Sequence, residues 1–218
     1  MKKRTMKKAQ SVSFRTDLFQ YIHVFLFSVV LLAVSYWYIS WLKIPNPLNK
    51  SFADTSIYLI GLSMVLASVC YFWNVFDRFI VYRKHLGIVG FAFGLMHVYL
   101  SFGALQKLFI VQTWQKGAMW PALTGAMALV IFVVMAFVTP SVVAEKLGGK
   151  IWRSILQLGH LGVVLIWLHV YFLKFGYILK WYNEGMKTLP SSSLIVLMFM
   201  TVVIGLRTAL WIVLKKKS

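Results

Sequence analysis

The sequence predicts an all-α integral membrane protein built as a bundle of six transmembrane helices. The chain has 218 residues, of which 60% are hydrophobic and only 13% are charged, whereas soluble proteins carry about a quarter charged residues. Apolar stretches long enough to cross a bilayer, which takes about 20 residues, occur six times. Most of the net charge of +18 falls at the ends of these stretches, as in membrane topology signals, so nucleic acid is not expected as a partner.

The six spans are expected at roughly residues 19–41, 55–76, 85–105, 119–139, 152–175 and 192–214. The first lacks a small-residue cleavage site, so we interpret it as a retained helix rather than a signal peptide. The second contains the only cysteine, Cys70, which excludes an intrachain disulfide. The fourth has Pro121 in its first turn and Pro140 just after its end, two places where helices accept proline. The spans form one membrane domain over 19–214, between basic segments at 1–18 and 215–218.

The distribution of basic residues predicts the orientation of the bundle. With the N-terminus in the cytoplasm, sixteen of the 23 Lys and Arg residues lie on the cytoplasmic side and seven on the other side. Cytoplasmic loops of membrane proteins carry such an excess of positive charge. Both termini are therefore expected to be cytoplasmic.

The third span lies in the segment RKHLGIVGFAFGLMHVYLS, residues 83–101, and places three glycines before a histidine. Gly87, Gly90, Gly94 and His97 are spaced by 3, 4 and 3 residues, so on a helix all four lie within about 80° of one another. We expect this ribbon of small residues, which ends in an imidazole, to be a face against which a haem lies. Close packing of two helices is the alternative explanation of such a stripe.

The fifth span repeats the pattern with Gly159, Gly162, His169 and Gly176, which are spaced by 3, 7 and 7 residues and share a face. His169 and His97 both fall about 10 Å from the outer ends of two helices that run parallel. Two imidazoles at a common depth predict the axial ligands of one haem iron. Histidines that merely bond between helices are the alternative, although an ionisable residue within the hydrocarbon is a functional hypothesis by default.

Three other side chains are weaker candidates. His160 precedes His169 by nine residues and so lies half a turn away on the helix. We expect His85, at the membrane border, to be solvated or to contact lipid headgroups, and a second haem between His85 and His160 would be strained by an offset of about 4.5 Å. Arg207 is expected to snorkel to the interface, and its alternative role is to bind a haem propionate. His23 is interfacial and is assigned no role.

The segment RKHLGIVGFAFGLMHVYLSF resembles the third helix of the ferric reductase-like transmembrane domain family, in which a basic pair, Leu-Gly and a later histidine recur. Trp152, followed 17 residues later by His169, resembles the fifth helix of that family. The resemblance covers most of the chain and is strongest over 83–101 and 152–172. The nearest parallel is a stand-alone six-helix member of similar size, the haem-binding membrane subunit of the bacterial periplasmic methionine sulfoxide reductase.

The resemblance implies a multi-pass protein of the bacterial inner (plasma) membrane, with His97 and His169 as the ligands of haem b. The chain departs from the family at two positions. Leu156 stands where the family commonly has another histidine, and Lys84 stands 13 residues before His97 in place of a histidine. One outer haem is therefore expected, and a second haem is the alternative.

The expected function is that of a b-type cytochrome subunit, the electron-transfer part of an oxidoreductase, which passes single electrons across the bilayer. No GxGxxG motif follows a predicted strand, so the electrons are expected to come from a separate flavoprotein reductase or from quinol, and flavin and quinone are further candidate cofactors. The expected acceptor at the outer face is a partner reductase, ferric iron or oxygen. The basic cytoplasmic rim is expected to bind anionic lipid, or alternatively an acidic flavoprotein; it comprises Arg78, Arg83, Lys84, Lys146, Lys150 and Arg153.

The alternative function is that of a haem-free membrane protein, either a small transporter or an assembly partner. All five acidic residues are expected in loops or at helix ends: Asp17, Asp54, Asp77, Glu145 and Glu184. An ion-coupled transporter would be expected to carry an acid within the membrane and a pair of interrupted spans. The acid distribution therefore argues against transport.

Overall fold

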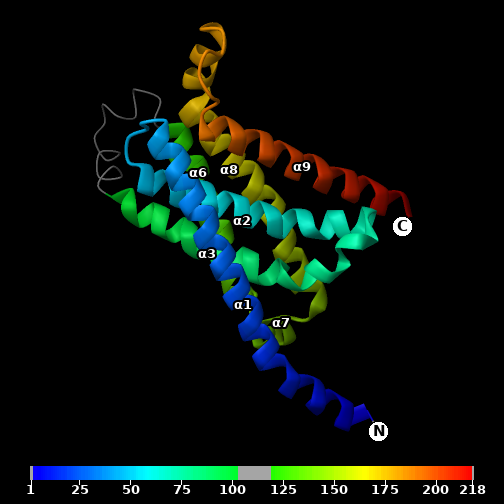
Figure 1. Cartoon of the computed structure of the whole chain (residues 1–218). Helices are drawn as coiled ribbons and strands as arrows, with labels where there is room; N and C mark the ends of the chain where they lie inside the picture. The colour runs from blue at the N-terminus through cyan, green and yellow to red at the C-terminus, as the bar shows by residue number, and fades with distance from the viewer. Residues whose placement is uncertain (1, 103–118, 218) are drawn as a thin grey trace.

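The chain folds as a bundle of long helices, shown by a computed structural model that describes residues 2–102 and 119–217 (Figure 1). The elements in order are α1 (Lys2–Trp41), α2 (Pro47–Phe72), the 3-10 helix η1 (Asn74–Tyr82), α3 (Arg83–Leu100), α6 (Met119–Val138), α7 (Ser141–Leu147), α8 (Gly149–Asn183) and α9 (Ser192–Lys217). The described ranges contain no strand. Six of the helical segments are long and apolar enough to cross a membrane, so the predicted all-α, six-span architecture is confirmed.

The bounds of the spans differ from the predicted ones where polar residues continue a helix. α2 begins at Pro47, before the predicted start at 55, because proline is favoured in the first turn and Asn46 precedes it in the left-handed conformation. α8 continues to Asn183, and its C-terminal end projects beyond the other helices at the top of Figure 1. The predicted end of the third span, 103–105, lies outside the described residues.

The helices associate unevenly. α3 packs chiefly on α2, and α6 packs chiefly on α8, whereas α3 makes only sparse contact with α6. α1 crosses the bundle obliquely and rests mainly on α2, and its N-terminal part extends away from the other helices (Figure 1). The bundle therefore contains two closely packed helix pairs, α2–α3 and α6–α8, which α9 joins through its contacts with α2 and α8.

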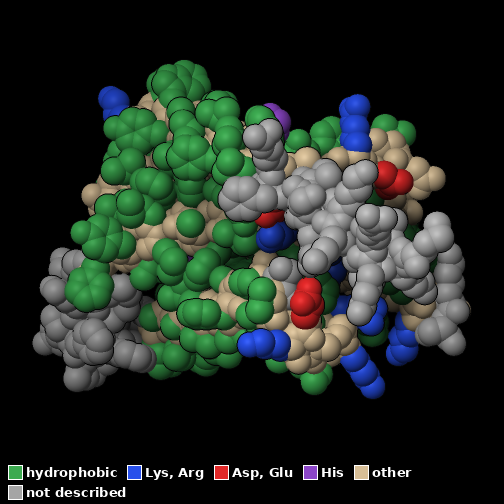
Figure 2. All heavy atoms as spheres, turned by 90° about the horizontal axis from the view of Figure 1, so that it is seen from below, with side chains coloured by type: hydrophobic (Ala, Val, Ile, Leu, Met, Phe, Trp, Pro, Cys, Tyr) green, Lys and Arg blue, Asp and Glu red, His purple; other side chains and the backbone are tan. Residues whose placement is uncertain are grey.

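The largest hydrophobic cluster lies where α2, α6, α8 and α9 meet, and its members include Ile60, Phe132, Val163 and Met200. Many other large apolar side chains face outward, among them Phe25, Val130 and Phe137. Figure 2 shows hydrophobic side chains covering much of one face, while most of the Lys and Arg side chains in view lie toward the side that carries both termini in Figure 1. An apolar exterior of this kind is suited to a lipid bilayer.

The prediction that all acidic residues lie in loops or at helix ends is wrong for Asp54. Because α2 begins at Pro47, Asp54 lies inside the helix, where it is only 4% exposed. Its carboxylate is paired with Lys50 at 3.3 Å, and Lys50 also donates a hydrogen bond to Ser193 of α9. The acid distribution therefore no longer argues against a transporter.

Candidate functional site

His97 lies at the C-terminal end of α3, where its ring is anchored to the first turn of α2. The Nδ1 atom of His97 lies 2.7 Å from the Oδ1 atom of Asn49. The amide oxygen can only accept, so His97 donates from Nδ1, and its Nε2 atom carries the lone pair. The amide nitrogen of Asn49 in turn donates to the hydroxyl of Ser101 at 2.9 Å, which fixes the orientation of the amide.

His169 lies in the middle of α8, and its ring is anchored to the start of α6. The Nδ1 atom of His169 lies 2.7 Å from the carbonyl oxygen of Pro121. A carbonyl can only accept, so Nδ1 of His169 is also the protonated nitrogen, and Nε2 again carries the lone pair. The ring reaches this carbonyl across Gly125, because a Cβ atom at Gly125 would stand 2.7 Å from Nδ1 of His169.

The two histidines therefore share one arrangement. Each is partly buried, each donates from Nδ1 to a fixed oxygen, and neither Nε2 has a hydrogen-bond partner among the described residues. The two side chains are close enough for an electrostatic interaction between them. One belongs to the α2–α3 pair and the other to the α6–α8 pair. A histidine that ligates a metal almost always donates its other ring nitrogen in this way, so the hydrogen bonding of each ring is of the kind found at metal-binding histidines.

The glycine stripe of α3 is not a haem face. A Cβ atom at Gly87, Gly90 or Gly94 would meet Ser63, Leu59 and Ile60, or Ser56 respectively, and all of these belong to α2. The hydroxyl of Ser56 donates to the carbonyl of Gly90 at 2.7 Å, which ties the two helices together. The prediction that a haem lies against this face is therefore wrong, and close helix packing explains the stripe.

The stripe of α8 is likewise a packing surface over most of its length. A Cβ atom at Gly159 would meet the side chain of Met135, and one at Gly162 would meet Phe132; both neighbours belong to α6. Gly176 has open space around the position of its missing Cβ. The small residues thus bring α6 and α8 together and let His169 reach the backbone of α6.

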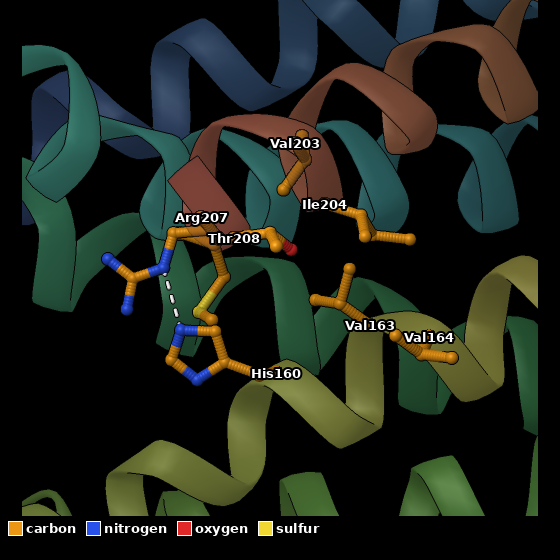
Figure 3. Close-up of a pocket in the computed structure, with 8 residues that line it drawn as sticks. His160, Val163, Val164, Val203, Ile204, Arg207 and Thr208 are labelled. Atoms are coloured by element: carbon orange, nitrogen blue, oxygen red, sulfur yellow. Dashed lines mark hydrogen bonds between the residues drawn. The ribbon is translucent and has the colours of Figure 1, made fainter. Parts of the chain in front are cut away.

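His160 and Arg207, two weaker candidates, contact each other in a cavity of about 70 Å³ between α8 and α9 (Figure 3). The Nε atom of Arg207 donates to Nε2 of His160 at 2.8 Å, and Nδ1 of His160 lies 2.7 Å from the carbonyl of Gln157. Both ring nitrogens are therefore engaged. In this arrangement His160 has no nitrogen available for a metal, and Arg207 is directed at an imidazole within the bundle.

His85 is buried rather than solvated, so the expectation of a solvated or headgroup-bound side chain is wrong. It is 2% exposed, with Nε2 at 2.9 Å from Asp17 of α1 and Nδ1 at 3.2 Å from the carbonyl of Val81. The ring of Tyr21 packs edge-on against it. His85 thus pairs with α1 while His160 pairs with α9, and the structure does not direct these two imidazoles at a common centre. His23 is exposed and lies 3.4 Å from the hydroxyl of Tyr82.

Sequence reasoning missed the residues that orient the two central histidines. Asn49 and Gly125 had no role in the sequence interpretation, and Pro121 was noted only as a helix-start signal. Asn49 lies in a stretch that hydropathy assigns to a loop, and a backbone carbonyl leaves no trace in a sequence. Gly125 alone offered a signal, as an isolated glycine inside an apolar helix.

No group of three or more His, Cys, Asp or Glu side chains within residues 2–102 and 119–217 is arranged to hold a bare metal ion. A haem requires only one or two axial ligands from the protein, because the porphyrin supplies the others. No protein-family model matches the chain, and no curated protein matches it significantly.

Proposed function

We propose that the chain is a b-type cytochrome subunit of the ferric reductase-like kind, with His97 and His169 as the axial ligands of one haem. The observation that carries the proposal is the matched anchoring of the two imidazoles. Each Nδ1–H is held by a fixed oxygen, at 2.7 Å in both cases, and each leaves Nε2 for a metal. Resident haem iron would supply reversible one-electron chemistry.

The protein would contribute ligand orientation and tuning. Asn49 and the Pro121 carbonyl hold the protons on Nδ1 and so select the tautomer that presents Nε2. Hydrogen bonding at Nδ1 also makes the opposite nitrogen a better donor to a metal. Both rings are partly buried, and a lower local dielectric strengthens the electrostatic effect of these contacts.

The role we propose for the subunit is to pass single electrons across the membrane, from a cytoplasmic flavoprotein or quinol to an acceptor on the outer face. Partner reductase, ferric iron and oxygen are the proposed acceptors. With both termini cytoplasmic, as the charge bias predicts, the His97 and His169 end of the bundle faces outward. The proposed location is the bacterial inner membrane.

The experiment that tests the proposal is a visible spectrum with haem quantification on the full chain, expressed with ample haem and purified in detergent. We expect one haem b per chain and a low-spin spectrum that changes on reduction. Protein without a Soret band would overturn the proposal and leave the haem-free transporter or assembly partner. The pairing of Lys50 with the buried Asp54 in α2 is the specific observation that would then favour transport, since ion pairs in membrane helices mark ion pathways.

Replacing Asn49 by alanine is expected to lower the affinity for haem about 10- to 100-fold, because orienting partners of metal-bound histidines have effects of that size. The rate of haem transfer to apomyoglobin, which is the rate of haem dissociation and rises as the affinity falls, measures this effect. Ser101→Ala, which removes only the partner of the Asn49 amide nitrogen, should have a smaller effect. An Asn49→Ala protein that holds haem as tightly as the wild type would contradict the orienting role.

Replacing Gly125 by valine is expected to disrupt the low-spin spectrum although Gly125 is not a ligand. The added side chain would occupy the place of the His169 ring and break its hydrogen bond to Pro121. The matched control is Ala126→Val, one residue along α6 at an exposed position. Equal spectra of the two variants would show that the ring of His169 does not need the space above Gly125.

A further inference from the structure

A second cavity, separate from the central histidines, opens among α2, α3, α6 and α8 near the start of α3. Its volume is about 270 Å³, and its apolar walls include Ile60, Phe91, Phe132 and Trp152. Arg83 and Lys84 provide two cationic groups in its lining. The cavity is therefore amphipathic, with hydrophobic walls and a basic portion.

Arg83 is the unusual residue of this cavity. Its side chain is partly buried, and no carboxylate of the described residues pairs with it. Its backbone carbonyl accepts from the hydroxyl of Ser63 at 2.7 Å and its backbone N–H donates to Ile80, whereas its guanidinium has no hydrogen-bond partner among the described residues. A guanidinium has five donors and keeps its charge in a protein, so a partly buried arginine without a protein partner is a favourable place for an anion.

The neighbouring carboxylate does not pair with Arg83. The carboxylate of Asp17 is shared by Lys84, at 3.3 Å, and by His85, at 2.9 Å. Arg207 lies within electrostatic range of Arg83 and adds a second guanidinium. Its Nε atom donates to the Nε2 atom of His160, which carries no negative charge. This part of the bundle thus holds more positive charge than its described carboxylates balance.

We propose that this cavity binds one anionic phospholipid, with its phosphate at Arg83 and part of an acyl chain along the apolar walls. A phosphate oxygen pair matches the planar fork of a guanidinium. Basic pockets between transmembrane helices are recognised sites for anionic headgroups. The hydrophobic walls distinguish a lipid from free phosphate, which would gain nothing from Ile60 or Phe91. Leu156 also lines the cavity and offers the acyl chain a further apolar contact.

The test is native mass spectrometry of the delipidated full chain, titrated with phosphatidylglycerol or with phosphatidylcholine of the same acyl chains. We expect one phosphatidylglycerol to bind at least tenfold more tightly than phosphatidylcholine. Arg83→Gln should reduce that preference roughly tenfold, whereas Arg78→Gln should leave it unchanged. Arg78 is the matched control, because it carries the same charge but is exposed and stacks on Phe79.

A second pair of variants tests the location without altering charge. Ala136 lines the cavity, so Ala136→Phe should fill it and weaken phosphatidylglycerol binding, whereas Ala126→Phe on the exposed face should not. Equal binding of the two lipids would overturn the proposal. So would unchanged phosphatidylglycerol binding in Arg83→Gln or in Ala136→Phe, or full competition by inorganic phosphate. The haem spectrum serves as a fold control in every variant that loads haem, and circular dichroism serves otherwise.

Discussion

Alanine at position 97 or at position 169 is expected to abolish the low-spin haem spectrum. Each replacement removes one of the two Nε2 atoms that the structure leaves without a hydrogen-bond partner among the described residues. An iron held by a single imidazole becomes five-coordinate or takes up water, and its spectrum changes to a high-spin form. Absorption and electron paramagnetic resonance spectra of the purified variants, at matched haem loading, measure this effect.

The control is His23→Ala, which changes an exposed histidine bonded only to Tyr82. A sharper test replaces His169 by glycine and adds imidazole to the buffer, because free imidazole can enter the space of the missing ring and restore the low-spin form. Retention of the wild-type spectrum in His97→Ala or His169→Ala would refute the ligand assignment. Loss of the spectrum in His23→Ala would show that the effect is not specific to the proposed ligands.

The second large effect is expected at Gly90, where even alanine should destabilise the bundle. A Cβ atom there would stand 2.9 Å from Cβ of Leu59 and 3.0 Å from the backbone nitrogen of Ile60. Backbone cannot move aside as a flexible side chain can, so α2 and α3 must separate. The expected cost is about 1–3 kcal/mol, which is typical of overpacking. The midpoint of thermal unfolding in detergent measures it.

Gly205→Ala is the matched control, because the position of the Cβ at Gly205 has nothing within 4 Å. It lies in α9, so both substitutions make the same change in a membrane-spanning helix. The Gly90 variant should unfold at the lower temperature. Equal midpoints for the two variants would mean that α2 and α3 are not packed as closely as the structure shows.

Much of the fold could be predicted from the sequence, because hydropathy and length alone identify helices that span a bilayer. The six spans are confirmed, and the proline positions 121 and 140 correctly indicated the limits of α6. The bounds were less predictable where polar residues find partners inside the bundle. Lys50 and Asp54 lower the hydropathy of the first turns of α2, yet they pair with each other within the helix.

The candidate site could be predicted only in part. The sequence identified His97 and His169 as candidates, and their common depth stays a prediction. Glycine stripes have the same appearance whether a helix or a cofactor covers them. In the structure α2 covers the stripe of α3, and α6 covers Gly159 and Gly162 of α8. The orienting contacts could not be foreseen, because each joins residues 48 positions apart, His97 to Asn49 and His169 to Pro121. Such pairings depend on how helices pack, which periodicity does not specify.

The division of the bundle into two helix pairs has a consequence for assembly. His97 is anchored within α2–α3 and His169 within α6–α8, and α3 touches α6 only sparsely. A metal centre held by both imidazoles would cross-link the N-terminal and C-terminal halves of the polypeptide. A cofactor that binds only when the two helix pairs are packed together raises the free energy of unfolding of the protein. The supply of cofactor during biosynthesis would then determine how much of the protein folds and escapes degradation by proteases.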